Sequence, residues 1–217
     1  GYRHRARLYG GPVSGHWRLG SIHAEGEQIV PFSSCPLLAP QLNQLTLQVA
    51  KAIEERDARV TNMELAWSSV DGHGGVFITM DAAIRSLAQA LAEFQVENHE
   101  LKSVVIHGQS GELRRYGDDT LMYPHQRADS FALRFAPGMF THANPEVNDL
   151  LIGALLERVG DVQNTRLLEL YAGIGNMSVP LAKAGAQVTA MESDERTAVF
   201  LERNAYSAGV EMECLPH

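Results

Sequence analysis

The segment Arg166–Lys183 reads RLLELYAGIGNMSVPLAK and contains the clearest structural signal in the chain. An apolar run ends at Gly173 and Gly175, and the residues after these glycines have helical spacing. The segment therefore predicts a strand, a tight glycine turn and a helix. Glycines suit such a turn because the backbone must bend sharply and let a ligand approach the amides at the start of the helix.

An acidic residue lies at the end of the next predicted strand. This strand covers Gln187–Met191, and Glu192 follows it, 17 residues after Gly175. An acid in this position can accept hydrogen bonds from the hydroxyl groups of a ribose. The GxG turn alone is a weak signal, because Ser178 replaces the third glycine of the dinucleotide-binding fingerprint. Glu192 is thus a candidate cofactor contact, and a solvated acid is the alternative interpretation.

Length and composition limit the class of protein. The 217 residues are enough for one large domain or two small ones, and 45% of them are hydrophobic. The sequence shows no apolar run of about 18 or more residues and no leader peptide, so we expect a cytoplasmic protein without a membrane partner. The two cysteines, Cys35 and Cys214, do not suggest a disulfide framework.

The charge of the chain is unevenly distributed. The net charge of −8 has the wrong sign for a protein that mainly clamps nucleic acid. Arg3, Arg5 and Arg7, however, fall on one face if residues 2–9 form a strand. Such a stripe can hold phosphate groups, with a solvated strand face as the alternative interpretation.

The order of the predicted elements divides the chain into two parts. Residues 1–135 predict an antiparallel α+β domain, whose first two strands are joined by a turn at Gly10–Pro12 and a loop at Gly15. After Pro137 the order becomes helix, strand, glycine turn, helix and strand, which indicates a parallel, doubly wound α/β sheet. Residues 136–217 supply only two strands of such a sheet, so we expect the incomplete N-terminal part of a Rossmann-like domain.

Two further expectations concern this second part. Asn144 is suited to cap a helix that starts at Pro145. The apolar residues of this helix are expected to face the core, namely Val147, Leu150, Leu151, Ala154 and Leu155. Because an unfinished sheet leaves an open edge, we also expect self-association through residues 165–215, or poor order there.

Several motifs in combination resemble a known family. FTHANPEVN (Phe140–Asn148), LLELYAGIGNMSVPLA (Leu167–Ala182) and MESDERTAVFLERNA (Met191–Ala205) are similar to the RNA uracil-5-methyltransferases, which make 5-methyluridine in ribosomal and transfer RNA. GYRHRARL (Gly1–Leu8) and SSCPLLAPQLN (Ser33–Asn43) resemble the central domain of that family, particularly its 23S ribosomal RNA branch. The resemblance implies an S-adenosylmethionine-dependent enzyme, with a central α+β domain followed by a Rossmann-like methyltransferase domain.

The resemblance also assigns site residues. The implied cofactor contacts lie around the glycine turn and the strand ends, namely His142, Tyr171, Gly173, Gly175, Asn176 and Glu192. His142 stands where the family usually has a glutamine, and a neutral imidazole donates and accepts in only one tautomer at a time. The implied RNA contacts are Arg3, Arg5, Arg7 and Phe140. The Phe140 ring would stack near the target base, with a core aromatic as the alternative interpretation.

Cys35 lies in a Cys-Pro context that holds the fourth ligand of a [4Fe–4S] cluster in cluster-containing members of the family. Four thiolates are normally needed, so the resemblance implies a cluster only in a longer parent protein. The nine histidines show no ligand spacing, and no metal site is expected.

The family's mechanism indicates what this sequence lacks. A cysteine thiolate attacks C6 of the uracil, C5 takes the methyl group, and a general base removes the C5 proton. The nucleophile and the base of the family lie beyond the end of this sequence, and Cys214 has acidic neighbours that disfavour a thiolate. We therefore expect no catalytic residue here and no activity of the chain alone. A non-catalytic RNA-binding or scaffold module and a small-molecule methyltransferase remain open as alternatives.

Overall fold

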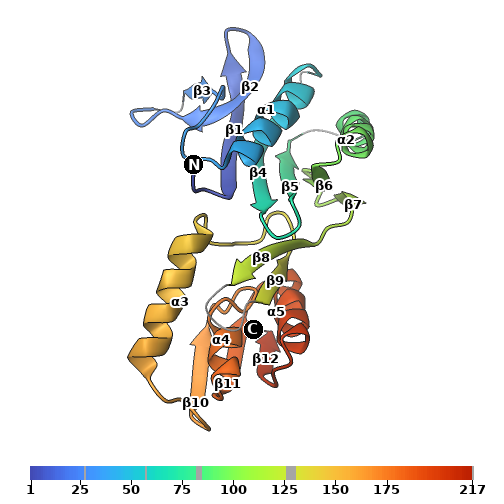
Figure 1. The fold of residues 1–217 in the computed structure, drawn as a ribbon. Helices are drawn as coiled ribbons and strands as arrows, with labels where there is room; N and C mark the ends of the chain where they lie inside the picture. The colour runs from blue at the N-terminus through green and yellow to red at the C-terminus, as the bar shows by residue number, and fades with distance from the viewer. Residues whose placement is uncertain (27, 57, 82–84, 126–130, 217) are drawn as a thin grey trace. The chain divides into compact units, whose positions relative to one another are not determined.

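The computed structural model describes most of the chain, that is, residues 1–26, 28–56, 58–81, 85–125 and 131–216. The chain folds into two compact units (Figure 1). The first is Gly1–Leu121 with Ala136–Gly138, and the second is Met122–Phe135 with Met139–His217. The described residues 122–125 and 131–135 thus group with the second unit, whereas the sequence assigns them to the first part.

The first unit is built on a seven-stranded sheet. Its strands, in their order across the sheet, are β3 (Ile29–Pro31), β2 (His16–Ile22), β1 (Arg5–Val13), β4 (Val60–Ser68), β5 (His73–Met80), β6 (Leu101–His107) and β7 (Leu113–Gly117). All neighbours are antiparallel except β5 and β6, which are parallel because helix α2 (Arg85–Glu97) carries the chain between them. The unit therefore mixes helices and strands as expected, with one parallel pair that the sequence did not predict.

The core of the first unit lies between this sheet and its helices. Helix α1 (Pro40–Glu54) has fully buried apolar residues at helical spacing, namely Leu42, Leu45, Val49 and Ile53. Leu87 and Leu91 of α2 are also buried in this core, each at 1% exposure. Each helix thus buries one apolar face against the sheet.

The first hairpin turns at the predicted Gly15 loop and not at Gly10–Pro12. Strand β1 continues through Gly10–Pro12, which pair with β2, and the chain turns at Ser14 and Gly15, with φ angles of 51° and 82°. At Gly10 a Cβ atom would lie 1.7 Å from the carbonyl oxygen of Val60. This glycine therefore allows a neighbouring strand to approach closely, and the predicted turn at these residues was wrong.

The second unit contains a parallel three-stranded sheet and a two-stranded sheet. The parallel sheet has the order β10 (Arg166–Leu170), β11 (Gln187–Glu192) and β12 (Glu213–Pro216), and helices α4 (Ser178–Lys183) and α5 (Glu195–Ser207) connect these strands. The two-stranded sheet pairs β8 (Leu121–His125) with β9 (Phe131–Phe135). The expectation of only two parallel strands was wrong, since β12 is a third strand and contains Cys214.

The two faces of the parallel sheet differ in exposure. In β10, Leu167 packs against the core, and Glu169 accepts a hydrogen bond from Ser178 of α4. Leu168 and Leu170 point to the other face and are 63% and 57% exposed. One face of β10 is therefore packed, whereas the other presents apolar side chains at the surface.

Helix α3 (Pro145–Val159) starts as predicted but buries other residues than expected. The Asn144 side chain accepts hydrogen bonds from the amides of Glu146 and Val147 at 3.1 and 3.2 Å, so the predicted cap is confirmed. Three residues of the expected apolar face are exposed, namely Val147, Leu150 and Leu151. The helix instead buries Pro145, Asn148, Asp149 and Ile152. Two of these are polar, and they belong to the site described next.

Candidate functional site

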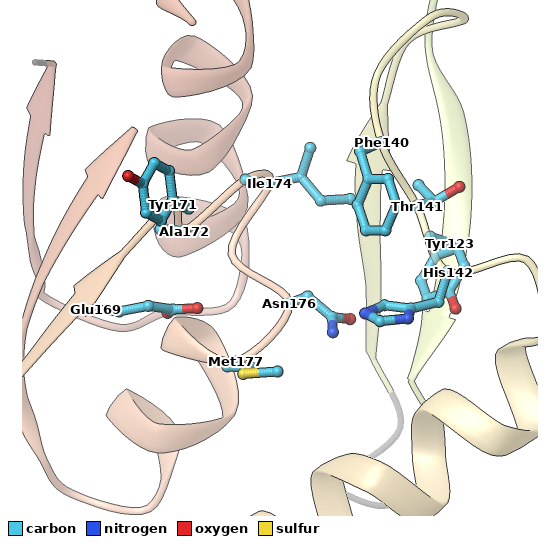
Figure 2. A pocket seen from close by; sticks show the side chains of 11 residues that line it. Tyr123, Phe140, Thr141, His142, Glu169, Tyr171, Ala172, Ile174, Asn176 and Met177 are labelled. Atoms are coloured by element: carbon cyan, nitrogen blue, oxygen red, sulfur yellow. The ribbon is translucent and has the colours of Figure 1, made fainter. Parts of the chain in front are cut away.

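A pocket of about 450 Å³ lies beside the glycine turn in the second unit. Figure 2 shows Phe140 and His142 on one wall and Tyr171 on the opposite wall, next to the end of β10. Four of the six predicted cofactor contacts line this pocket, namely His142, Tyr171, Gly173 and Asn176. Gly175 and Glu192 do not line it, but both support the turn.

The turn after β10 has an unusual backbone. Tyr171, Gly173 and Gly175 have φ angles of 58°, 59° and 95°. A left-handed conformation at a residue other than glycine costs on the order of 1 kcal/mol, so Tyr171 stores strain at the pocket. Its side chain is 86% exposed, which leaves the ring accessible to a ligand.

Glu192 ties the end of β11 to two neighbouring segments. Its Oε2 accepts a hydrogen bond from the amide of Gly173 at 2.8 Å, and its Oε1 accepts one from the amide of Asp194 at 2.9 Å. An ionised carboxylate has about four acceptor sites. Two backbone hydrogen bonds therefore leave acceptor capacity for the hydroxyl groups of a ligand.

Asn176 connects the turn to α3. Its side-chain amide exchanges two hydrogen bonds with the amide of Asn148, both at 2.9 Å. Because Asn148 is 1% exposed, this pairing is a buried link between α3 and the glycine turn.

Two histidines close to this link are shifted toward their neutral form. Burial lowers the pKa of His125, which is 2% exposed, and the neighbouring His142 lowers it further. The negative charge of Asp149 and the neighbouring Asn176 oppose this shift. Burial also lowers the pKa of His142. The imidazole of His142 is therefore a neutral donor or acceptor in the pocket near pH 7.

Sequence reasoning missed several polar residues of this site. Tyr123 and His125 lie on the same face of the short strand β8, and Asp149 lies in the first turns of α3. In the sequence these residues look like ordinary polar positions. Glu169 gave a usable signal, since it is an acid inside the apolar run LLELY and lines the pocket.

The ionisation of Glu169 leads to a testable prediction. Burial raises the pKa of this carboxyl, although the hydrogen bonds from Ser178 oppose the shift. An acid with a raised pKa stabilises the fold below its unfolded pKa, near 4.5, and this contribution is lost as the pH rises through the folded pKa. We therefore expect Glu169→Gln to be more stable than wild type at pH 7 and no more stable at pH 4.

Thermal unfolding of both proteins at the two pH values measures this difference. The exposed Glu157 of α3 provides the matched control, because Glu157→Gln should have little effect at either pH. A Glu169→Gln variant that is less stable than wild type at pH 7 would contradict the prediction.

Asn204 of α5 supports the pocket from behind. Its Oδ1 accepts a hydrogen bond from the amide of Arg134 at 2.7 Å, and its Nδ2 donates to the carbonyl oxygens of Arg134 and Ile174, both at 2.9 Å. The side chain is 2% exposed. One buried amide thus joins β9, α5 and the glycine turn.

The predicted arginine stripe lines a groove of about 960 Å³ in the first unit, together with Cys35. Arg5 and Arg7 share the carboxylate of Glu64, with Nη2 to oxygen distances of 2.5 and 2.7 Å. Arg3 lies outside β1 and forms an isolated bridge with Leu38. The groove is therefore lined by three guanidinium groups, two of which pair with the nearly buried carboxylate of Glu64.

Phe140 is not a core residue. It is 67% exposed, and its ring lies edge-on to His142 with the ring centroids 5.4 Å apart. The alternative interpretation as a core aromatic was therefore wrong. An exposed ring at the rim of a pocket is accessible for stacking.

The cysteines do not belong to a metal centre within the described residues. No group of three or more His, Cys, Asp or Glu side chains in those ranges is placed to hold a metal ion. Burial raises the pKa of the Cys214 thiol, and the negative charge of Glu202 raises it further.

Among the described helices, none has the length and apolar character needed to cross a membrane.

Comparisons with known proteins identify the family. The family model described as tRNA (Uracil-5-)-methyltransferase matches residues 78–210, more than half of the chain. The 23S rRNA (uracil(1939)-C(5))-methyltransferase RlmD of Shewanella sediminis is 27% identical over 97% of this chain and 48% of its own length. The RlmD of Shewanella putrefaciens is 30% identical over 88% of this chain and 44% of its own length. The chain thus spans about half the length of the curated relatives it matches.

A solved structure has the same fold. The Pyrococcus abyssi tRNA (uracil-54, C5)-methyltransferase, in complex with S-adenosyl-L-homocysteine, has a TM-score of 0.74 and 17% identity, over 100% of this chain and 55% of that one. The residues that the family model matches include both motifs on which the resemblance rests, Phe140–Asn148 and Leu167–Ala182. The chain belongs to the RNA uracil-5-methyltransferase family.

Proposed function

We propose that this chain is the cofactor-binding and RNA-facing part of an enzyme that methylates C5 of a uridine, in 23S ribosomal RNA. The observation that carries the proposal is the pocket at the glycine turn, which four predicted cofactor contacts line. The printed names of the RlmD relatives support the substrate, since they specify a uracil of 23S rRNA. The parallel strands β10–β12 with their connecting helices would then form part of a Rossmann-like methyltransferase domain.

The residues of the pocket and of the adjoining end of β11 fit S-adenosylmethionine, which supplies an activated methyl group when bound. Glu192 offers free acceptor sites for the ribose hydroxyls at the end of β11. Gly173 has no atom within 4 Å of a would-be Cβ, so its backbone is open to close approach by a ligand. Tyr171 and His142 add an exposed ring and a neutral imidazole on opposite walls.

The RNA-facing role rests on charge and exposure. Arg3, Arg5 and Arg7 line one groove and can contact phosphates, which are recognised mainly through positive charge. Phe140 offers an exposed ring on which an unstacked base could lie. The arginines lie in the first unit and Phe140 lies in the second.

We also propose that the chain alone transfers no methyl group. A thiolate nucleophile needs a lowered pKa, and the Cys214 thiol is shifted the other way. Cys35 is a single thiol in the other unit, and one thiol does not fit a [4Fe–4S] cluster, which normally needs four. The chain therefore binds and orients the cofactor and the RNA. The covalent attack on the uracil needs residues that this chain does not supply.

Calorimetric titration with S-adenosylhomocysteine tests the cofactor assignment. Wild type should bind saturably, and Glu192→Ala should bind at least about 10-fold more weakly, because hydrogen bonds to a charged group contribute about 1.5–3 kcal/mol. Glu195→Ala is the matched control, since Glu195 is an exposed acid on the neighbouring helix α5. Equal affinity of Glu192→Ala and wild type, or no binding by wild type, would contradict the proposal.

A non-catalytic RNA-binding module is the second candidate, and the arginine groove favours it. Binding of RNA without binding of S-adenosylhomocysteine would support this alternative.

We further propose that the chain self-associates through β10, which lies at an edge of its sheet and exposes Leu168 and Leu170. Sedimentation should then show a concentration-dependent dimer that Leu168→Lys suppresses, and a monomer at every concentration would exclude it.

A further inference from the structure

A carboxylate accompanies the proposed RNA contacts of the arginine groove. Glu64 of β4 is 8% exposed and is not among the residues that line the groove. Its Oε2 lies 2.5 Å from Nη2 of Arg5, and its Oε1 lies 2.7 Å from Nη2 of Arg7. A carboxylate repels phosphate groups, so the charge of Glu64 alone opposes the binding of RNA. Any favourable contribution of Glu64 to RNA binding therefore acts through the arginines that it contacts.

The strand register explains how one side chain reaches both arginines. Arg7 of β1 lies directly opposite Glu64 of β4, and Arg5 lies opposite Ala66, the next residue on the same face of β4. The carboxylate is thus opposite one arginine and diagonal to the other, which is within the reach of long side chains. A carboxylate has about four acceptor sites, so it can accept hydrogen bonds from both guanidinium groups at once. It also offsets the repulsion between two positive charges on one strand face.

The two arginines differ in their access to a ligand. The side chain of Arg7 is 49% exposed, whereas that of Arg5 is 17% exposed. A guanidinium group has five N–H donors in a fixed plane, so it can bind a carboxylate and a phosphate at the same time. A long side chain that is already held in place also loses less conformational entropy when it binds. Arg7 is therefore the member of this pair that is suited to contact a phosphate.

We propose that Glu64 is a positioning residue, which holds the guanidinium group of Arg7 in place for a backbone phosphate of the RNA. The inference rests on the proposed function, because it concerns RNA binding in the same groove. Arg5 binds the other oxygen of the carboxylate, and Nδ2 of Asn62 donates to Oε1 at 3.4 Å, so the carboxylate is itself fixed. Glu64 thus improves the geometry of RNA binding although its charge opposes it.

Two substitutions of Glu64 separate geometry from charge. The full chain is titrated, at several salt concentrations, into a fluorescent fragment of 23S ribosomal RNA that contains uracil 1939, the base named for the RlmD relatives. Glu64→Gln removes the negative charge, and Glu64→Asp keeps the charge but shortens the side chain by one methylene group. We expect each to lower the affinity by about 10-fold, as for the loss of one hydrogen bond to a charged group. If Glu64 acted only through its charge, Glu64→Gln would instead bind more tightly with a steeper salt dependence, and Glu64→Asp would bind like wild type.

Arg7→Ala shows whether Glu64 acts through this arginine. The substitution should lower the affinity by about 10-fold and reduce the slope of the salt dependence by about one. In the Arg7→Ala background, Glu64→Gln should not lower the affinity further, because the group that it positions is gone. A general disturbance of the sheet would weaken binding in both backgrounds. Glu54→Gln is the matched control, since Glu54 pairs with Arg18 at 2.8 Å in the same unit but outside the groove, and it should not weaken RNA binding.

The outcomes separate this inference from the proposed function. If wild type binds the RNA and Glu64→Gln binds it equally or more tightly, the inference is wrong and the proposed function stands. The same holds if Glu64→Gln weakens binding by the same factor with and without Arg7, or if Arg7→Ala binds like wild type. Should Glu64→Gln fail to fold, Glu64→Asp is compared in the two backgrounds by the same criteria. If wild type does not bind the RNA, both the inference and the RNA-facing role fail.

Discussion

Replacing Asn204 with alanine is expected to lower the free energy of unfolding of the second unit by about 3–5 kcal/mol. The substitution removes the partner of the Arg134 amide and of the carbonyl oxygens of Arg134 and Ile174. Each buried backbone group left without a partner costs about 1–3 kcal/mol. The side chain is 2% exposed, so water cannot easily replace it. The loss also frees Ile174 in the glycine turn, and affinity for S-adenosylhomocysteine should fall with stability.

The two units allow an internal control for this measurement. Trp17 and Trp67 both lie in the first unit, so their fluorescence follows that unit alone. Hydrogen exchange of the amides in β11 and α5 reports the second unit. We expect Asn204→Ala to increase exchange there while the tryptophan transition stays near that of wild type.

Two variants test the cause of the loss. Asn204→Asp keeps the volume of the side chain but replaces the donor NH₂ group with an acceptor that faces two carbonyl oxygens, so it should destabilise at least as much as alanine. Ser207→Ala removes only the exposed contact with Arg134 and should change stability by less than about 0.5 kcal/mol. A loss below about 1 kcal/mol for Asn204→Ala would show that these hydrogen bonds contribute little.

The features that the sequence predicted correctly are local in the chain. The glycine turn, the Asn144 cap and the position of Glu192 depend on neighbouring residues or on a short spacing, and the structure contains all three. In these cases the local preference and the tertiary contact favour the same arrangement.

The features that the sequence missed depend on contacts between distant residues. Asn148 and Asn176 are 28 positions apart, and nothing in either segment indicates that their amides pair. This pairing turns a polar face of α3 inward, which explains why Val147 and Leu150 are exposed although periodicity predicts them in the core. Strand β12 was missed because it is four residues long and begins with an acid.

Gly175→Ala is expected to destabilise the second unit by about 2–4 kcal/mol, because two costs combine. The φ angle of 95° lies in a region that residues with a Cβ rarely adopt. A Cβ atom here would also lie 2.9 Å from Cγ2 of Val179 and 3.1 Å from Cδ1 of Leu201. Both of these side chains are fully buried, so neither can move aside without repacking the core of the unit.

Gly173→Ala is the matched comparison, because the two glycines share one turn but have different surroundings. Gly173 has a φ angle of 59°, and its Cβ would meet no atom within 4 Å, so the substitution should cost only about 1 kcal/mol. Gly173 lines the pocket, however, and a methyl group there would occupy space that the ligand needs. We therefore expect Gly173→Ala to lose affinity for S-adenosylhomocysteine with a small change in stability, and Gly175→Ala to lose mainly stability. Unfolding curves and titrations of both variants measure this contrast, and the opposite order would mean that Gly175 rather than Gly173 is the point where the ligand approaches the backbone.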